Sequence, residues 1–224
     1  MSSAVTPIDS GPTAAAAATT AVAQRTADRV VDAALVAFGR NGYAATSLDD
    51  LAAELGIRKQ SILYHHASKE ILLDAVIDRA VAELMTVFDT IIATSDGGFA
   101  RVEAMVRGVF RLAIRRPELL GLLREITRLG PPALTRATAA LEPLISGATA
   151  WLDREMDEGR VRRSDPRLLA FSVYSTVMGV ATEVEVLRAV GLEPTLRETV
   201  VRRRELLRFL QSALTEPAPS PVAT

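Results

Sequence analysis

Apolar side chains recur every three or four residues along most of the 224-residue chain, which is the spacing of one face of an α-helix. The first such stripe consists of Ala27, Val31, Ala34, Leu35 and Phe38. Gly42 follows it and predicts the end of a helix, because glycine tolerates the left-handed conformation beyond a helix C-terminus. No segment combines sustained alternation with β-branched residues, so we expect an all-α protein of about nine helices.

Capping and helix-breaking residues divide this pattern into segments. A short second helix follows Thr46 or Ser47 and ends at Gly56, a third covers 58–65, and a long fourth begins near Ser68. The later helices are expected at 99–115, 117–129, 132–159, 165–190 and 195–214. Asp165 with Pro166, and Thr195 with Glu198, are typical helix N-termini.

The two ends of the chain lack the pattern. Residues 1–23 and 215–224 are dominated by small residues and proline, which bury too little surface to offset ordering entropy, so we expect two disordered tails. The first tail lacks the charged and Leu-rich parts of a secretory signal, and no segment is apolar enough to span a bilayer. We therefore expect a cytoplasmic protein that makes no contact with a membrane.

The composition also bears on the chemistry. Cysteine is absent, which excludes disulfides, Cys-ligated metals and a thiol nucleophile. The only histidines, His65 and His66, are adjacent, so their rings would point about 100° apart on a helix and could not readily share a metal. We expect no metal, no cofactor and no catalytic residue, and hence not an enzyme.

Residues 46–65 have the form of a helix-turn-helix, in which the first helix supports a second that lies in the major groove of DNA. The second helix would begin with Arg58, Lys59, Gln60 and Ser61. Arginine pairs with guanine and glutamine with adenine, so this first turn is the candidate base-reading surface. The remaining DNA-binding candidates are Thr46, Ser47, Tyr64, His65 and Lys69.

The overall charge of −1 excludes a nucleic-acid binder driven by bulk charge. Residues 24–70 carry six basic and six acidic side chains, yet the stretch from Gly56 to Lys69 carries three cations and no acid. Few phosphate contacts per subunit imply weak non-specific affinity, so specific binding would need base contacts and a dimer. The alternative is a solvated helix that carries two cations by chance.

Residues 24–73 resemble the DNA-binding region of TetR-family transcriptional regulators. The resemblance rests on Phe38, Gly42-Tyr43, Thr46-Ser47 and the strings LDDLAAELGI and ILYHHASKEILL. It implies a DNA-binding domain at 24–70 and an effector-binding and dimerisation domain at 71–214. The chain departs from the family pattern at Arg58, which cannot cap a helix, and at Tyr64, which stands one residue late. The usual phosphate contact therefore falls to either Tyr64 or His65.

The same resemblance implies that the larger domain binds an effector. Candidate pocket residues are the methionines and aromatic residues of this domain: Met85, Phe88, Met105, Phe110, Trp151, Phe171, Tyr174 and Met178. Such side chains adapt to apolar ligands, so we expect a lipophilic small molecule, although any one of these residues is more often plain core. Arg115, Arg116, Arg124 and Arg128 either receive an anionic head group at the pocket mouth or form a solvated face.

The last two helices are the candidate dimer interface, through 165–190 and 195–214. Leu196, Val200, Arg203, Leu207, Leu210 and Leu214 form a heptad-like seam. Two such helices from each subunit would build a four-helix interface, and the resulting homodimer would match a palindromic operator in double-stranded DNA. The expected function is a ligand-responsive repressor. The alternatives are an all-α lipid carrier or enzyme that uses the apolar cavity, and a helical adaptor with a decayed DNA-binding head.

Overall fold

The computed structural model describes residues 14–193 and 195–215, and this part of the chain is helical throughout with short connections. The helices are α1 (Ala14–Asn41), α2 (Leu48–Leu55), α3 (Lys59–His65), α4 (Lys69–Thr94), α5 (Phe99–Arg115), α6 (Pro117–Leu129), α7 (Ala133–Asp157), α8 (Pro166–Thr182), α9 (Val184–Ala189) and α10 (Leu196–Leu214). The all-α prediction is confirmed, with one helix more than expected.

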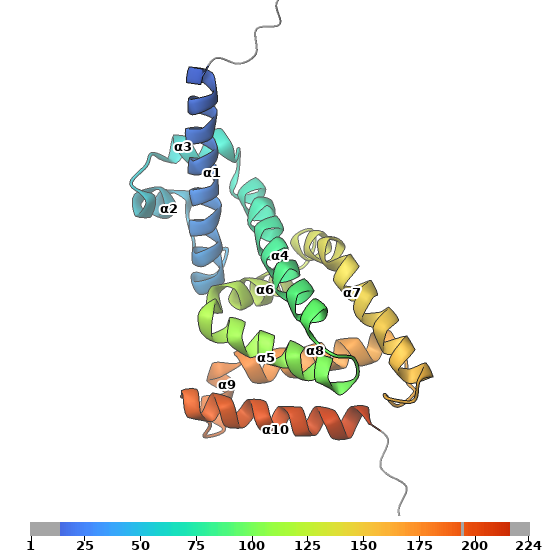
Figure 1. Cartoon of the computed structure of the whole chain (residues 1–224). Coiled ribbons are helices and arrows are strands. Elements are labelled where there is room, and N and C mark those ends of the chain that lie inside the picture. The colour runs from blue at the N-terminus through green and yellow to red at the C-terminus, as the bar shows by residue number, and fades with distance from the viewer. Residues whose placement is uncertain (1–13, 194, 216–224) are drawn as a thin grey trace, which may run out of the picture.

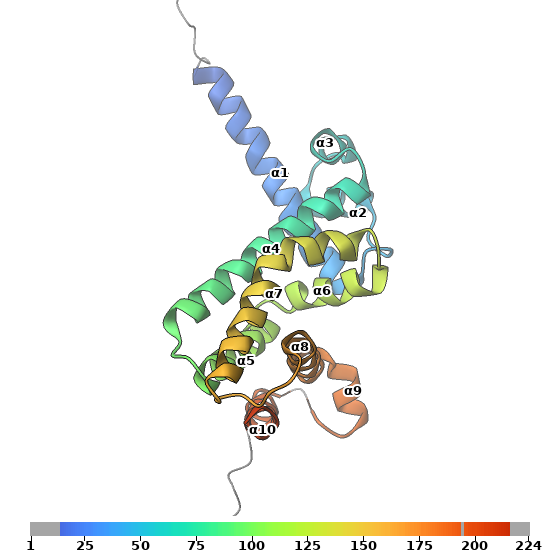
Figure 2. The ribbon, with the colours of Figure 1, turned by 90° about the vertical axis from the view of Figure 1, so that its right-hand side faces the viewer.

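The helices form a small head and a larger body (Figure 1). The head consists of α2 and α3 beside α1, and the long helix α4 leads from it into the body. At the far end of the body, α8 and α10 pack against α5, as the quarter-turn view also shows (Figure 2). No helix within residues 14–193 and 195–215 is long and apolar enough to cross a bilayer.

Two apolar clusters hold these helices together. The first joins the head to the body without a break, since Phe38 of α1 and Ile62 of α3 share it with Leu72 of α4 and Leu122 of α6. The second lies at the far end, where Phe110 of α5 meets buried leucines and valines of α7, α8 and α10. Burial of apolar surface stabilises both clusters, and the first one fixes the head on the body.

The N-terminal boundary differs from the prediction. Helix α1 begins at Ala14, so residues 14–23 are helical where a disordered tail was expected. The run Ala14–Ala18 explains the difference, because alanine has the highest helix propensity and extends a helix that is already nucleated by its packed part. The rest of the expected tails, 1–13 and 216–224, lies outside the described residues.

The expected helix 165–190 is two helices. Asp165 caps its start as predicted, accepting hydrogen bonds from the backbone N–H groups of Arg167 and Leu168. The helix stops at Thr182, whose carbonyl oxygen accepts a hydrogen bond of 2.7 Å from Arg124 of α6. Glu183 leaves the helical conformation and α9 starts after it. The break coincides with a contact from a distant helix, which no local sequence pattern reveals.

Candidate DNA-binding interface

The helix-turn-helix is built as the sequence predicts, beginning with a complete capping box on α2. The Ser47 hydroxyl accepts a hydrogen bond from the Asp50 N–H at 3.1 Å, and the Asp50 carboxylate accepts one from the Ser47 N–H at 3.2 Å. Hydrogen bonding from Ser47 holds the pKa of Asp50 below its ordinary value. Gly56 closes the helix at φ +66°, a conformation that costs glycine nothing.

Helix α3 presents its first turn to solvent. Its N-cap is Arg58, which makes no side-chain capping bond, so its guanidinium is free to reach outward. Arg58, Lys59 and Gln60 are exposed, while Ile62 on the opposite side is fully buried in the head. Lys59 forms an ion pair of 2.8 Å with Asp49 of α2, so one of the three predicted cations is partly neutralised.

The second turn of α3 holds the aromatic candidates. Tyr64 is 83% exposed, and its ring meets the His65 ring edge-on at 5.1 Å. His66 follows at the helix end and is half-buried. Its burial, together with the neighbouring His65, lowers the pKa of its imidazole. Of the two candidates for the phosphate contact, Tyr64 is exposed and His65 is half-buried, so Tyr64 is the more accessible.

Tyr43 organises the junction between the head and α4. The Lys69 ammonium lies 4.2 Å from the centre of its ring, and its hydroxyl donates to the Glu70 carboxylate at 3.3 Å. Burial and then the nearby Glu70 charge raise the pKa of Tyr43 to about 12, so the hydroxyl stays a donor over the working pH range. Lys69 is thereby held half-buried at the first residue of α4.

One DNA-binding candidate is placed in the interior. Thr46 is buried, and its hydroxyl donates a hydrogen bond of 3.0 Å to the Gly42 carbonyl. It therefore stabilises the turn between α1 and α2, and its side chain does not lie on the outer surface. Ser47, Arg58, Lys59, Gln60 and Tyr64 are exposed, and Ser61, His65 and Lys69 are half-buried. Apart from Thr46, the structure thus gathers the candidates on the helix-turn-helix and the start of α4.

The opposite side of the head rests on α6 through two glycines. Gly39 of α1 and Gly121 of α6 approach so closely that a Cβ built on either would overlap a backbone carbonyl oxygen of the other helix: that of Glu118 for Gly39, and that of Gly39 for Gly121. Only glycine fits at such a helix crossing. The α1–α6 contact therefore sets the position of the head on the body.

Two buried carboxylates of α6 flank this crossing. Glu125 accepts the Tyr43 backbone N–H at 2.7 Å, which ties α6 to the turn before the helix-turn-helix, and it also accepts hydrogen bonds from Arg128. Glu118 accepts from Arg116 at 2.8 Å. Burial alone would raise the pKa of Glu118, but a backbone hydrogen bond and the Arg116 guanidinium outweigh it and hold that pKa below its ordinary value.

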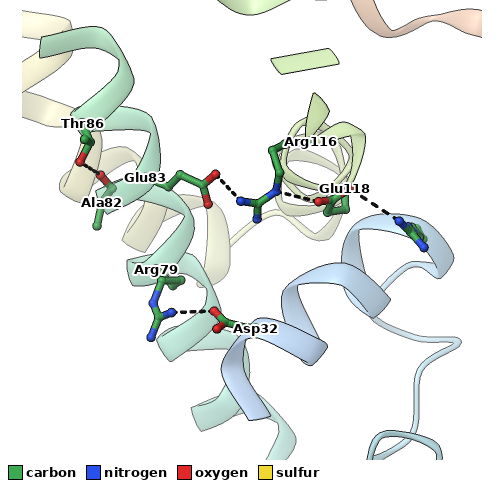
Figure 3. A network of polar contacts seen from close by, with 8 residues as sticks. Asp32, Arg79, Ala82, Glu83, Thr86, Arg116 and Glu118 are labelled. Atoms are coloured by element: carbon green, nitrogen blue, oxygen red, sulfur yellow. Dashed lines mark hydrogen bonds and ion pairs between the residues drawn. The ribbon is translucent and has the colours of Figure 1, made fainter. Parts of the chain in front are cut away.

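A polar network links these contacts to α4. Figure 3 shows Arg116 reaching from Glu118 to Glu83 of α4, the latter at 2.6 Å, while Arg79 of α4 donates to Asp32 of α1 at 2.6 Å. Each of the three helices α1, α4 and α6 is thus bonded to another through charged side chains. The head is fixed from two sides, by α4 and by α6.

The eight candidate pocket residues are not brought together. Met85, Phe88 and Met178 pack on the first apolar cluster, whereas Phe110 lies inside the second and Trp151 packs against it, 5.6 Å beneath the Arg101 guanidinium. Met105 is half-buried on α5. Phe171 and Tyr174 are 64% and 49% exposed on α8, so within one subunit they line no cavity.

Two clefts open beside α6, and neither is lined by these eight residues. One of about 260 Å³ lies between the end of α1 and α6, next to Glu125 and Arg128. The other, of about 360 Å³, lies between Arg40 of α1, the start of α6 and the junction of α8 with α9. Among the described residues, no group of three or more His, Asp and Glu side chains is placed to hold a metal ion.

Several residues that matter for the site were absent from the sequence prediction. Glu118, Gly121 and Glu125 share one side of α6 and face the head, yet their spacing alone looks like that of an ordinary solvated helix face. Gly39 interrupts the apolar stripe of α1, which was the available signal for a close helix approach. Of the four arginines considered for a pocket mouth, Arg116, Arg124 and Arg128 are already bonded within the protein.

Comparisons with known proteins agree with this architecture. Residues 30–76 match the family model described as bacterial regulatory proteins, tetR family. The HTH-type transcriptional repressor DrrR1 of Streptomyces coeruleorubidus is 36% identical over 110 residues, which cover 49% of this chain and 39% of that protein. The chain thus spans about two fifths of that relative's length.

Two solved structures share the fold over most of the chain. A TetR transcriptional regulator from Chloroflexus aurantiacus superposes with a TM-score of 0.71 at 22% identity, covering 87% of this chain and 98% of that one. AibR, solved in complex with isovaleryl coenzyme A and operator DNA, gives 0.66 at 19% identity, covering 84% and 97%. The helix-turn-helix in residues 46–65 lies within the segment that matches the tetR family model, and the chain shares the fold of these two regulators.

Proposed function

We propose that the chain is a dimeric repressor that binds a palindromic operator and is released from it by a lipophilic small molecule. The DNA-binding part of this proposal is supported by the difference between the two sides of α3, one exposed and one buried. Arg58 and Gln60 are exposed on the first turn, whereas Ile62 anchors the helix in the head. A rigidly held helix with a free polar first turn is what major-groove reading requires.

The charge distribution supports a pair of heads acting together. Between Gly56 and Lys69 the cations are Arg58, Lys59 and Lys69, and Lys59 is shared with Asp49. Few phosphates are neutralised per head, so a single head would bind weakly and with a shallow salt dependence. Two recognition helices about 34–36 Å apart would double the contacts and match successive major grooves.

A selection of duplexes bound by the purified protein, followed by fluorescence anisotropy on the selected site, tests the DNA-binding assignment. We expect Arg58→Ala and Gln60→Ala each to weaken specific binding by roughly 5- to 100-fold and to relax the base preference at one position. Arg111→Ala, at an exposed arginine of α5, is the matched control and should bind like the wild type. Unchanged affinity in both α3 variants would reject the assignment of α3 as the reading helix.

The dimer would form through α8 and α10, which leave large apolar side chains exposed. Leu168, Phe171 and Tyr174 of α8 and Leu196 and Val200 of α10 are all about half or more exposed. The heptad-like seam predicted on α10 is only partly available for this contact. Its Leu210 and Leu214 are buried in the subunit's own second cluster.

Sedimentation equilibrium of Phe171→Glu tests this interface. A carboxylate in an apolar interface would be desolvated without a partner, so we expect the dimer to dissociate at least 100-fold more readily and DNA affinity to fall with it. Glu158→Gln, an exposed change at the end of α7, is the control. A Phe171→Glu protein that remains dimeric would place the interface elsewhere.

The effector part of the proposal draws on the related fold of AibR, whose solved complex contains isovaleryl coenzyme A. Binding of a ligand to the body can shift the population toward a head arrangement that no longer fits the operator. Operator release by isovaleryl coenzyme A and by longer acyl derivatives, with free coenzyme A as control, is the direct test. Because the operator is chromosomal DNA, we place the protein in the cytoplasm.

A further inference from the structure

The two clefts beside α6 adjoin at the crossing of α1 and α6. Gly39, Arg40, Gly121 and Arg124 line both of them. The smaller cleft, of about 260 Å³, follows the end of α1, and the larger, of about 360 Å³, extends to the junction of α8 with α9. A molecule that occupied both clefts would therefore touch the head and the body at once.

The smaller cleft is positively charged. Its ionisable side chains are Arg40, Arg124, Arg128 and Glu125, three guanidinium groups against one carboxylate, which gives a formal charge of +2. Both carboxylate oxygens of Glu125 are already engaged, since Oε1 accepts the Tyr43 backbone N–H and Oε2 accepts from Arg128. The cleft thus holds more positive charge than its own acid can neutralise.

Arg40 is the least engaged of the three arginines. Its side chain is 64% exposed, and the ion pair that it makes with Glu118 is long, at 3.9 Å. That carboxylate is shared, because it also accepts a hydrogen bond of 2.8 Å from Arg116. The Arg40 guanidinium therefore has donors available at the head side of the cleft.

Arg124 and Arg128 approach from the body side, on α6. Arg124 donates through Nη1 to the Thr182 carbonyl, and Arg128 donates through Nε and Nη2 to Glu125. A guanidinium carries five N–H donors, so each of the two has further donors for a ligand. A phosphate monoester suits this arrangement, because its three terminal oxygens can accept from two helices and its charge of nearly −2 matches that of the cleft.

The larger cleft offers an apolar surface next to this cationic one. Its apolar lining consists of Ala113, Pro117, Leu120, Ala181 and Val184. Its three carboxylates are each paired with an arginine: Glu118 with Arg116 at 2.8 Å, Glu183 with Arg124 at 3.6 Å, and Glu185 with Arg188 at 2.6 Å. Glu183 and Glu185 are also well exposed, so water and salt screen their charges. The carboxylates of the larger cleft therefore do not prevent the approach of an anion.

We propose that the adjoining clefts bind a phosphate monoester that carries an apolar chain. Arg40, Arg124 and Arg128 hold the phosphate, and the chain lies in the larger cleft. The proposal rests on the effector part of the proposed function, for which it names a site and a head group. A ligand in this position touches both helices of the Gly39–Gly121 crossing, so its binding can shift the position of the head without any contact to α3.

Isothermal titration calorimetry of the full chain at constant ionic strength is the first test, with hexyl phosphate, inorganic phosphate and hexanol as probes. We expect hexyl phosphate to bind at least 10-fold more tightly than inorganic phosphate, because burial of about two methylene groups already gives that factor. Hexanol, which lacks the anion, should give no measurable binding. Equal affinities for the two phosphates, or equal affinities for hexanol and hexyl phosphate, would overturn the proposal.

Substitutions in the two clefts locate the two parts of the ligand. Arg40→Gln should weaken the binding of hexyl phosphate by roughly 10-fold, because a charge-assisted hydrogen bond is lost, and Arg40→Lys should recover part of it. Arg111→Gln, at an exposed arginine of α5 that lines neither cleft, is the matched control and should bind like the wild type. Val184→Asn should weaken hexyl phosphate several-fold and leave inorganic phosphate unchanged. If Arg40→Gln binds like Arg111→Gln, or if Val184→Asn leaves hexyl phosphate binding unchanged, the site is rejected.

Operator binding separates this proposal from the proposed function. Arg40 lies near the end of α1 that meets α6 (Figure 1), so Arg40→Gln should bind operator like the wild type but require roughly 10-fold more hexyl phosphate for release. Binding of hexyl phosphate that depends on Arg40, in a protein that binds no DNA, would uphold the site while rejecting the regulator. Operator release at equal hexyl phosphate concentrations in the wild type and in Arg40→Gln would uphold the regulator while rejecting the site.

Discussion

The two sides of the DNA-binding head are built on opposite principles. On the inner side, α1 meets α6 at the Gly39–Gly121 crossing, flanked by the buried Glu118 and Glu125. On the outer side, the first turn of α3 is exposed, and Lys59 in that turn forms an ion pair with Asp49. The inner side determines where the head stands, and the outer side determines what it can contact.

This difference separates stability from recognition. Substitutions on the inner side disturb packed backbone and buried charges, so they should lower the free energy of unfolding and displace the head. Substitutions on the outer side touch solvated side chains, so they should change DNA affinity and leave stability within about 0.5 kcal/mol of the wild type. Substitutions on the two sides should therefore have separable effects, and the largest is expected at the α1–α6 crossing.

Gly39→Ala should be the most damaging change. The added methyl group would overlap the Glu118 backbone carbonyl, which cannot move like a flexible side chain, so α1 and α6 must separate. Overpacking of this kind costs about 3 kcal/mol, which lowers Tm by roughly 6–12 °C. Differential scanning calorimetry measures the loss, and operator affinity should fall with it.

Gly147→Ala supplies the matched control for that experiment. Gly147 also lies within a helix, α7, but a Cβ there meets no atom within 4 Å. Alanine should stabilise this helix by about 0.5–1 kcal/mol, because glycine loses more backbone entropy on folding. If Gly39→Ala were as harmless as Gly147→Ala, the close crossing would not hold the head.

Glu125→Ala should have the next largest effect. The change leaves the part-buried Tyr43 N–H without its acceptor, which costs about 2 kcal/mol in urea unfolding. Glu125→Gln retains an acceptor oxygen and should cost about half as much. Equal losses in the two variants would show that the carboxylate charge, and not the hydrogen bond to Tyr43, provides the stability.

The contrast between the two sides also explains what the sequence could reveal. The outer side is local in sequence: Ser47, Asp50, Gly56 and the α3 cations lie within a few turns, so helix periods and caps were enough to predict it. The inner side joins residues about 80 positions apart, such as Tyr43 and Glu125. The periodicity of a single helix does not reveal such a pair. In the sequence, a buried glutamate of α6 cannot be distinguished from a solvated one.

In the body, too, local sequence patterns predicted the helices but not their long-range contacts. The apolar pattern of α8 and α10 predicted both helices, but not which apolar residues face the subunit's own core. Phe171 was expected in a pocket and is exposed, whereas Leu214 was expected at an interface and is buried. The break after Thr182 coincides with a hydrogen bond from Arg124, 58 residues away. The spacing of apolar residues predicts which face of a helix is apolar. The packing of the other helices decides what covers that face.

Acid should weaken the inner side through Glu118. Its pKa in the folded protein is held below the ordinary 4.5, so its charged form stabilises the fold above that pH, and the contribution is lost as the pH falls through the lowered value. At pH 7, Glu118→Gln should cost about 1.5 kcal/mol, the low end for a hydrogen bond to a charged group. The Tm difference between variant and wild type should close as the pH falls below 4.5 and through the lowered pKa of Glu118, and a difference independent of pH would contradict the charge-based account.

Tyr64→Ala should reduce operator affinity by roughly 3- to 10-fold and leave Tm unchanged, because the ring is 83% exposed. A phosphate contact carries no base information, so the loss should be the same for matched and mismatched operators. His65→Ala, measured alongside, decides between the two candidates for this contact. A larger loss in His65→Ala would transfer the role to the half-buried imidazole.

The smallest effect should come from Asp49→Asn, and its sign is the most informative. Asp49 lies 2.8 Å from Lys59, and both side chains are well exposed, so their ion pair contributes little to stability. Removing the carboxylate frees Lys59 for a phosphate and removes a repulsive charge near the DNA. We expect operator affinity to rise by about 2-fold, with a steeper salt dependence, while Tm stays within a degree.

Lys59→Met should lower affinity and make Asp49→Asn ineffective in the double variant, because the gain depends on the freed ammonium. A gain that persists without Lys59 would mean that Asp49 acts by general repulsion, and that the outer side of the head is governed by its summed charge more than by individual contacts.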